Sequence, residues 1–449
     1  MQTKVDPGIF KSYDIRGIVP SELNEVTAEL IGRAFVQFLA CTSVAVGRDM
    51  RSSSEALFGG FARGVTTAGA DVIDLGLTST DELYFAVGKY GYPAGAMITA
   101  SHNPKEYNGF KLCREDAIAL SAETGVYAIR DLVTAGRFID VPRSGEVTTR
   151  DALPDFADHC LSFIDRAAIK PLTIVIDCGN GMGGLIVPAI FKHLPVKVVP
   201  LYFELDGSFP NHPASPIEPE NMADVQAAVR AHGADLGAAF DGDADRVFIT
   251  DERGELVGGD MVTALVAEML LRRHPGSTIL YNLICSRSVP EIITARGGRP
   301  IRTRVGHSII KAVMREQDAI FGGEHSGHFY FRDHYFADSG LIALLVVLEL
   351  LSREGKTVSE LLRPIDTRSR SGEINSRVDD IPAKLAQLEK RYGDADEIDH
   401  LDGITIQYAD WWFNVRPSNT EPLLRLNVEA DTPELLAQKT DELLALIRG

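Results

Sequence analysis

The chain has 449 residues, of which 45% are apolar and 24% charged, a composition typical of a globular protein. This length is too great for one hydrophobic core and predicts three or four domains. The formal net charge of -18 argues against a nucleic-acid-binding protein, because an acidic surface repels phosphates. It does not exclude a small anionic substrate, since a local cluster of cations can reverse the field inside a cleft.

The cysteines and the apolar runs indicate the compartment. The five cysteines are odd in number and form no CxxC pair, which predicts neither a disulfide framework nor a zinc site and fits a reducing cytoplasm. Residues 1–7 have no apolar signal core. The longest apolar run, 341–351, contains Glu349 and is too short to span a bilayer, so we expect a buried helix and no membrane partner.

From residue 43 onward, apolar strands alternate with helical patterns. Strands are predicted at 43–46, 71–75 and 94–98, with helices between them at 54–70 and 81–89. This β-α-β-α-β succession predicts a mostly parallel sheet covered by helices. The polar stretch 141–154 is rich in Pro, Ser, Gly and Thr and predicts a linker.

Two further units follow a similar plan. In the second unit we expect strands at 172–176 and 237–240, a helix ending near 193 and another at 220–231. In the third unit we expect helices at 260–273 and 289–295 and strands at 278–283, 300–304 and 319–321.

After residue 369 the order changes, and neighbouring strands are set apart from the helices. The strands are predicted at 403–408, 411–415 and 423–428, and the helices at 383–392 and 433–448. This arrangement is typical of a smaller α+β domain. The fold class is therefore α/β, with three similar domains at 1–148, 149–253 and 254–367 and a C-terminal α+β domain at 368–449.

A serine follows the buried strand 94–98, in the sequence Thr-Ala-Ser-His-Asn-Pro at 99–104. Ser101 is placed at the end of a strand, and Lys111 lies ten residues further on. A hydroxyl can carry a phosphoryl group while a nearby ammonium balances its charge. The alternative is an ordinary turn, since Ser, Asn and Pro all favour turns.

Three carboxylates leave the strand 237–240 at alternate positions, Asp241, Asp243 and Asp245, and Arg246 follows them. Clustered like charges are costly unless a cation neutralises them, and hard oxygen ligands suit Mg²⁺ or Ca²⁺. An EF-hand is excluded because Arg246 stands where that loop needs glycine. The arginine beside the cluster suggests a further anion such as phosphate. The alternative is a solvated acidic turn.

Two later loops also carry binding groups. The sequence Gly-Gly-Glu-His-Ser-Gly-His at 322–328 offers donors and acceptors for sugar hydroxyls, from Glu324, Ser326 and His328. The sequence Arg-Pro-Ser-Asn-Thr at 416–420 combines a guanidinium with hydroxyls and an amide, which suits a phosphate clamp but also fits a common turn. The clamp residues are Arg416, Ser418, Asn419 and Thr420.

Weaker candidates lie in other turns. Tyr13 and Arg16 belong to a turn near the N-terminus, and His307 follows a predicted strand, where an acid or base could sit. The glycine run 179–184 lacks the spacing of a dinucleotide fingerprint and predicts a tight strand-to-helix turn. Trp411 and Trp412 are interpreted as packing residues.

The four motifs, in this order, resemble those of the α-D-phosphohexomutases, most closely the bacterial phosphomannomutase/phosphoglucomutase branch. The resemblance runs from residue 13 to residue 422, with one motif in each predicted domain. It implies a heart-shaped, four-domain molecule with a central cleft. It also implies that Ser101 carries phosphate and, with Asp241, Asp243 and Asp245, holds Mg²⁺.

The resemblance assigns roles to the other candidates. Lys111 and His307 are both candidates for proton transfer, and Arg16 and Arg246 for steadying the transferred group. Tyr13, Glu324, Ser326 and His328 are expected at the sugar, and the residues of the 416–420 clamp at its non-reacting phosphate.

The implied reaction interconverts the 1- and 6-phosphates of mannose, glucose or both through a hexose 1,6-bisphosphate, which also serves as activator. The partner is then a small-molecule sugar phosphate, and the sequence carries no signal for an oligomeric state. Residues 283–285 are Leu-Ile-Cys, where some relatives place a lysine, and Asn419 stands where phosphoglucosamine mutases usually carry glycine. The alternatives are a phosphoglucosamine mutase, a non-catalytic sugar-phosphate-binding protein and a metal-dependent phosphatase.

Overall fold

The computed structural model describes residues 5–139, 141–418 and 423–449. The chain divides into two compact units, which are described separately: residues 1–262 with 326–358, and residues 263–325 with 359–449. The chain passes between units three times, within helix α8 (Gly259–Arg273), between residues 325 and 326, and within helix α12 (Val358–Leu362). No helix among the described residues has the length and hydropathy needed to cross a membrane.

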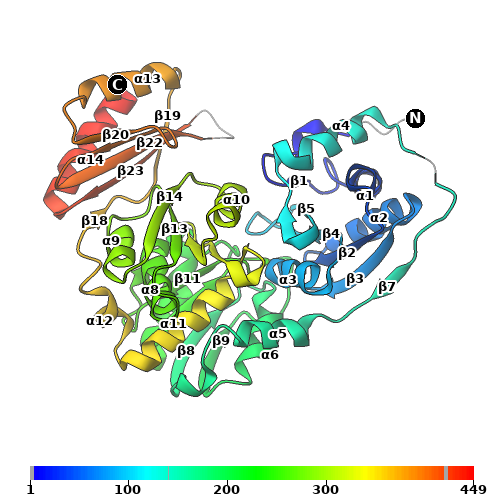
Figure 1. The fold of residues 1–449 in the computed structure, drawn as a ribbon, viewed down its shortest axis with the longest axis horizontal. Coiled ribbons are helices and arrows are strands. Elements are labelled where there is room, and N and C mark those ends of the chain that lie inside the picture. The colour runs from blue at the N-terminus through cyan, green and yellow to red at the C-terminus, as the bar shows by residue number, and fades with distance from the viewer. Residues whose placement is uncertain (1–4, 140, 419–422) are drawn as a thin grey trace. The chain divides into compact units, whose positions relative to one another are not determined.

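The first unit begins with a mixed sheet (Figure 1). Its spatial order is β1 (Ile15–Ile18), β5 (Tyr107–Arg114), β4 (Ala94–Ile98), β2 (Ser43–Arg48), β3 (Asp71–Leu77) and β7 (Val147–Thr149), with β6 (Ile118–Ala119) beside β5. Strands β4, β2 and β3 are parallel, as the β-α-β-α-β pattern predicts, and β7 adds a further parallel strand. Strand β5 runs antiparallel to β1 and β4, and neither β1 nor β5 was part of the predicted pattern.

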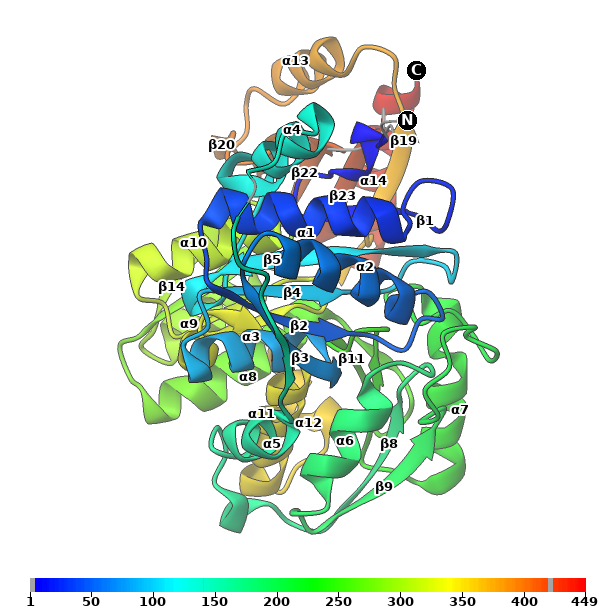
Figure 2. The same ribbon diagram turned by 90° about the vertical axis from the view of Figure 1, so that its right-hand side faces the viewer.

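Helices cover both faces of this sheet. Helices α1 (Glu25–Leu39) and α2 (Ser54–Thr67) pack side by side on one face, seen from the side in Figure 2. Successive residues of β2 and β4 belong in turn to two apolar clusters on opposite faces of the sheet. One cluster includes residues of α1 and α2, and the other includes residues of α3 (Thr80–Tyr90). Helix α4 (Tyr127–Ala135) packs against α1. The alternation follows from the two-residue period of a strand.

The stretch 141–154, expected to be a linker, is not wholly irregular. It contains the short edge strand β7, which pairs in parallel with β3, and its end enters helix α5 (Leu153–Leu161). All three residues of β7 are exposed. The strand is held by ladder hydrogen bonds and not by buried apolar side chains, so no hydrophobic pattern marks it.

The first unit also contains a second, five-stranded sheet. Its order is β12 (Leu256–Val257), β11 (Val247–Thr250), β10 (Leu236–Phe240), β8 (Leu172–Asp177) and β9 (Val196–Leu201). Helices α6 (Gly183–Phe191), α7 (Ala223–His232) and α11 (Gly340–Glu354) and the paired strands β16 (Phe329–Phe331) and β17 (Ala337–Asp338) complete this part. The glycine run 179–184 forms the predicted turn between β8 and α6, and the predicted apolar helix is α11, buried along most of its length.

The second unit has a parallel layer and a C-terminal sheet. The parallel strands are β14 (Arg299–Thr303), β13 (Thr278–Asn282) and β15 (Phe321–Gly323), accompanied by α9 (Ser288–Ala295) and α10 (His307–Gln317). The C-terminal strands are antiparallel, in the order β18 (Ser369–Arg370), β23 (Leu423–Ala430), β22 (Trp411–Pro417), β21 (Ile404–Gln407) and β20 (Glu397–Asp399), with β19 (Ile374–Arg377) also on β23.

Helices α13 (Ile381–Arg391) and α14 (Pro433–Arg448) accompany the C-terminal sheet, which has its own apolar cluster. Trp411 lies in this cluster, and the indole of Trp412 donates to Glu429. Both tryptophans are buried, in agreement with their interpretation as packing residues. Together the two units make the predicted multi-domain α/β fold with a smaller C-terminal α+β part.

Candidate functional site

Ser101 lies three residues after the end of β4 and adopts a left-handed backbone conformation, with φ 51°. This conformation costs a residue other than glycine on the order of 1–3 kcal/mol, and such strain gathers at functional sites. The Ser101 amide donates to Thr99 Oγ1 at 2.9 Å. The side chain is buried, and its hydroxyl donates to Asp241 Oδ2 at 2.7 Å.

Three buried carboxylates follow β10. Ligand atoms of Asp241, Asp243 and Asp245 all lie within 4.8 Å of one another. Ala244, between the last two, has φ 62°, and this left-handed residue is part of the turn that gathers the carboxylates. Glycine is required at position 242 because the backbone lies close to the Ser101 loop, and a Cβ there would be 2.4 Å from the carbonyl oxygen of Ser101.

Lys111 lies on β5, directly opposite Met97 of β4, and reaches the acidic turn. Its Nζ lies 2.6 Å from Asp243 Oδ2 and 2.5 Å from Asp245 Oδ2. Burial opposes the charged form, but the two carboxylates prevail and hold the pKa of Lys111 well above its ordinary value. The same contact holds the pKa of Asp243 below its ordinary value despite burial. Lys111 is therefore an ammonium ion at neutral pH.

Arg246 connects the acidic turn to Ser101. Its Nη2 lies 2.7 Å from Asp241 Oδ2 and 3.1 Å from Ser101 Oγ. Burial raises the pKa of Asp241 to about 6, although Arg246 acts in the opposite direction. The three carboxylates thus face two cations, Lys111 and Arg246.

The residues of this turn fit a divalent cation. Asp243 Oδ1 and Asp245 Oδ1 are buried and accept no hydrogen bond from the described residues. Together with Asp241 and the Ser101 hydroxyl they form a set of hard oxygen donors, which Mg²⁺ prefers to nitrogen or sulfur ligands.

Arg16 was predicted to lie in a turn, but pairing with β5 makes its segment strand β1, from which the side chain reaches the Ser101 turn. Arg16, on β1, donates from Nη1 to Asn103 Oδ1 at 2.7 Å and from Nη2 to Asp14 Oδ2 at 2.5 Å. Tyr13 is partly buried in the same segment. Arg16 is thus joined to the serine loop through a neutral amide.

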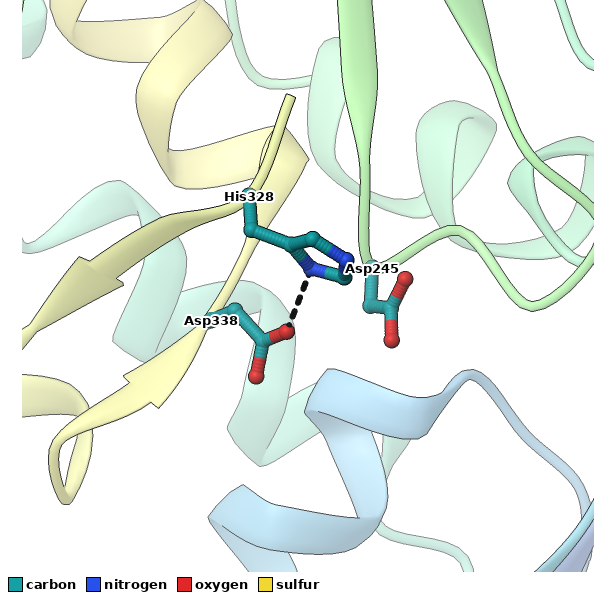
Figure 3. Close-up of side chains that lie close together, drawn as sticks. All are labelled: Asp245, His328 and Asp338. Carbon is teal, nitrogen blue, oxygen red and sulfur yellow. Dashed lines mark hydrogen bonds and ion pairs between the residues drawn. The ribbon is translucent and has the colours of Figure 1, made fainter. Parts of the chain in front are cut away.

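His328 extends the cluster on its other side (Figure 3). Its Nδ1 lies 2.8 Å from Asp338 Oδ2, and the opposite edge of the ring faces Asp245. A backbone bridge pairs His328 with Arg246. Burial acts against the imidazolium, but the hydrogen bond to Asp338 and the charge of Asp245 raise the pKa of His328. Ser326, in the same loop, is half-buried.

Three neighbours of these residues were not among the predicted site residues. His102 Nδ1 lies 3.2 Å from Ser101 Oγ and contacts Arg246, whose charge, together with burial, holds the pKa of His102 well below its ordinary value. Thr80 Oγ1 donates to Asp243 Oδ2 at 2.5 Å. Arg51 donates to the Ser101 carbonyl at 2.9 Å. His102 is adjacent to Ser101 in the sequence, whereas only the fold brings Thr80 and Arg51 to the site.

In the second unit, Glu324 lies beside the turn that opens α10. The amide of Gly306 donates to Glu324 Oε1 at 3.3 Å, and His307 is the first residue of the helix. Glu324 is buried at the end of β15. The predicted sugar-binding carboxylate and the residue preceding the predicted proton-transfer histidine are therefore neighbours.

The C-terminal sheet holds a pair of arginines. Arg416 on β22 lies directly opposite Arg425 on β23, and Glu373 accepts from both, at 2.8 and 3.1 Å. Arg425 also lies 3.4 Å from Ser418 Oγ. One carboxylate between two guanidinium groups leaves a net positive charge suited to phosphate. Arg425 and Glu373 extend the predicted clamp, and Asn419 and Thr420 lie outside the described residues.

Four family models described as phosphoglucomutase/phosphomannomutase match the chain in order. These are alpha/beta/alpha domain I over residues 7–140, domain II over 154–254, domain III over 258–367 and the C-terminal domain over 373–446.

Individual proteins match along the same length. The chain is 42% identical to "Phosphohexose mutases" of Xanthomonas campestris pv. campestris, over 98% of this chain and 99% of that protein. It is 42% identical to a phosphomannomutase of Escherichia coli K12, over 98% of each. A crystal structure of a phosphoglucomutase/phosphomannomutase family protein from Burkholderia thailandensis superposes with a TM-score of 0.91 at 34% identity, over 98% of this chain and 97% of that one.

Proposed function

Since this chain belongs to the phosphoglucomutase/phosphomannomutase family, we propose that it interconverts the 1- and 6-phosphates of mannose and glucose through a phosphoserine at Ser101. The protein is a hexose phosphate mutase, an isomerase that relocates a phosphoryl group on one sugar. The proposal of a phosphoserine rests on the residues that surround Ser101. A strained, buried serine points its hydroxyl at a carboxylate 2.7 Å away, with a guanidinium 3.1 Å from the same oxygen.

In the first half-reaction, a hydroxyl of the hexose 1-phosphate attacks the phosphorus on Ser101. The bond from phosphorus to the serine oxygen breaks, a bond to the sugar oxygen forms, and the product is a hexose 1,6-bisphosphate. In the second half-reaction the reoriented bisphosphate returns its other phosphate to Ser101, and a hexose 6-phosphate leaves. Added bisphosphate acts as activator because it rephosphorylates any Ser101 that has lost its group.

Arg246 and Lys111 are fixed positive charges beside the reacting group, and Arg16 extends from strand β1 to the loop that carries it. Positioned charges of this kind stabilise the developing charge of the transferred phosphoryl without reorganising. The raised pKa of Lys111 favours a role as a fixed cation that keeps its proton at neutral pH. Uptake of the proton from the attacking hydroxyl requires a lone pair, which an imidazole such as that of His307 provides when neutral.

Mg²⁺ would be held by Asp241, Asp243, Asp245 and an oxygen on Ser101, which match its preference for oxygen ligands. When bound, it supplies Lewis acidity and neutralises oxygen charge during the transfer.

The remaining residues would hold the sugar. Glu324, Ser326 and His328 offer partners for its hydroxyls, and Tyr13 lies in the segment of Arg16. Arg416 and Ser418, with Asn419 and Thr420, are assigned to the phosphate that is not reacting, and the charge of Arg425 supports that assignment. We divide the chain into domains at 1–148, 149–253, 254–367 and 368–449, one loop in each, and place it in the cytoplasm, where its five free cysteines would stay reduced.

The test measures turnover and phosphorylation together. Purified protein with Mg²⁺ and glucose 1,6-bisphosphate should convert mannose 1-phosphate and glucose 1-phosphate to the 6-phosphates. Intact mass should show one phosphate, which Ser101→Ala removes together with at least about a 10³-fold loss of kcat. Ser121→Ala, at a half-exposed serine whose hydroxyl bonds to Thr124, is the matched control.

Each alternative has its own outcome. Faster turnover of glucosamine 1-phosphate than of either hexose phosphate would replace the substrate assignment. Release of free inorganic phosphate at the rate of substrate loss would indicate a phosphatase. Binding without turnover would indicate a sugar-phosphate-binding protein. A fully active Ser101→Ala enzyme would rule out the phosphoserine.

A further inference from the structure

The Ser101 turn needs an external restraint. A serine with φ 51° is in a left-handed conformation that a free chain seldom adopts, and this conformation directs the hydroxyl at Asp241. One local bond, from the Ser101 amide to Thr99 Oγ1, helps to form the turn. Two backbone hydrogen bonds, from the Asn103 amide to Ala100 O and from the Tyr107 amide to Pro104 O, also lie in this turn. The turn is otherwise irregular from residue 101 to the start of β5 at Tyr107.

One side chain binds four carbonyl oxygens of this turn. Arg51, from the segment between β2 and α2, donates from Nη2 to Ser101 O at 2.9 Å and to Asn103 O at 2.6 Å. Its Nη1 donates to Pro104 O at 2.8 Å and to Tyr107 O at 3.0 Å. A planar guanidinium has a rigid fork of donors, so one group fixes the relative positions of all four carbonyls.

Arg51 is itself held from behind. Its Nε lies 3.2 Å from Asp49 Oδ2, and both side chains are almost fully buried. Asp49 also accepts from the Arg51 amide at 3.0 Å and from Ser54 Oγ at 2.6 Å. The ring of Phe209 lies 5.1 Å from the guanidinium carbon, and Gly207 is so close that a Cβ there would lie 2.5 Å from Arg51 Cα. The guanidinium therefore has a fixed place from which to bind the turn.

We propose that Arg51 is a positioning residue for phosphoryl transfer, holding the 101–107 turn in the strained conformation that keeps Ser101 Oγ at the acidic cluster. The inference rests on the proposed phosphoserine at Ser101. Arg51 donates to the backbone of the turn, whereas Arg246 contacts the Ser101 hydroxyl, so the two arginines have different tasks. Arg51 lowers the freedom of the nucleophile and does not balance the charge of the moving phosphate.

A positioning role predicts a loss in kcat and not in KM. Displacing a reacting atom by about 1 Å can cost on the order of 10²-fold in rate. Arg51→Lys should lower kcat about 10-fold or more, since an ammonium lacks the planar fork. Arg51→Met should lower it about 10²-fold, with KM for mannose 1-phosphate changed by less than about threefold.

The double variant Asp49→Asn/Arg51→Met controls for loss of folding in the single variant. It removes both buried charges together, so that no unpaired carboxylate remains at position 49. It should fold and bind substrate yet keep the kcat loss. Arg48→Met is the matched control. Arg48 is on β2, and among the described residues its side chain pairs with Asp74 and Glu55 and not with the turn. Its loss should therefore leave kcat within about threefold.

The experiment uses the full-length protein and measures kcat, KM, the mass of the phosphorylated form and hydrogen exchange of peptides covering 101–107. The expected result is a kcat loss with unchanged KM and faster exchange in this turn for the Arg51 variants alone. Wild-type kcat in the double variant, a loss confined to KM, or an equal loss in Arg48→Met would overturn the inference. If the wild-type protein is active but never phosphorylated on Ser101, the proposed function fails first, and that result is separate from any effect of Arg51.

Discussion

Glu82 gives a quantitative test of the electrostatics inside the first unit. It lies in the first turn of α3, is only 2% exposed, and its Oε2 accepts no hydrogen bond from the described residues. Burial raises the pKa of Glu82 from its ordinary value of 4.5 to about 8, the nearby charges of Asp81 and Asp151 adding to the effect and a hydrogen bond with Thr78 opposing it. Glu82 is therefore protonated in the folded protein at neutral pH.

The raised pKa of Glu82 determines how the stability of the fold changes with pH. Below pH 4.5 the carboxyl is protonated in both folded and unfolded chains, and its stabilisation is fully present. As pH rises through about 8, the unfolded chain has already released the proton and the folded chain must follow. Each pH unit is worth about 1.4 kcal/mol, so folding loses up to about 5 kcal/mol over this interval. Glu82→Gln, which has no proton to lose, should escape this loss.

The assay compares melting temperatures of Glu82→Gln and wild type from pH 5 to 9 by calorimetry. The advantage of the variant should grow with pH and reach on the order of 10 °C by pH 8.5 before levelling off. Glu123→Gln, at an exposed position, is the control and should show the same difference at every pH. A Glu82→Gln difference that stays constant from pH 5 to 9 would refute the reasoning.

Three further predictions concern other parts of the first unit. Gly242→Ala should lower kcat by about 10²-fold, because the new Cβ would lie 2.4 Å from the Ser101 carbonyl and must displace one loop; wild-type kinetics would contradict this. Chelation of divalent cations should abolish turnover, Mg²⁺ should restore it, and Asp243→Asn should raise the Mg²⁺ requirement about tenfold or more, so full activity in chelator would exclude a metal role. Burial lowers the pKa of His159 to about 4, so the protein should lose up to about 3 kcal/mol as pH falls from 6.5 to 4, and His159→Gln should flatten that part of the melting profile.

Regular elements with clear periodicity could be predicted from the sequence. Strand β4 and helix α14 have the predicted bounds, and β2, β3 and β10 differ from prediction by only one or two residues at an end. The helix predicted at 220–231 is instead a short 3-10 turn followed by α7 from Ala223. Pro219 at the start of that turn lacks a backbone donor, and the first four residues close tighter hydrogen bonds.

The site was predictable where its chemistry is local in the sequence. One turn holds Asp241, Asp243 and Asp245, and Ser101 is adjacent to His102. These motifs can therefore be recognised in the sequence without knowledge of the fold. Contacts that depend on strand register could not be predicted. Lys111 was predicted from its place after Ser101, but its contact with the acidic turn depends on the pairing of β5 with β4. Arg425 was not predicted at all, because it joins the clamp only through the pairing of β23 with β22.

Charge in the acidic turn links metal binding to phosphorylation. The three carboxylates Asp241, Asp243 and Asp245 face the cations Lys111 and Arg246, which leaves about one negative charge if all are ionised. A phosphate on Ser101 adds about two more negative charges, and Mg²⁺ removes two. The phosphorylated protein with metal therefore has nearly the same local charge as the unphosphorylated protein without it.

Metal binding and phosphorylation should consequently stabilise each other, since coupling between two sites is reciprocal. Mg²⁺ should bind the phosphorylated protein about tenfold or more tightly than protein from which phosphate has been discharged onto excess hexose 1-phosphate. Titration calorimetry on the two forms measures this ratio, and Arg48→Met, altered outside the turn, should reproduce it. Lys111→Met, which removes one of the two cations, should bind Mg²⁺ more tightly than wild type in both forms. Equal Mg²⁺ affinity in the two wild-type forms would show that the charges of the acidic turn are neutralised from elsewhere.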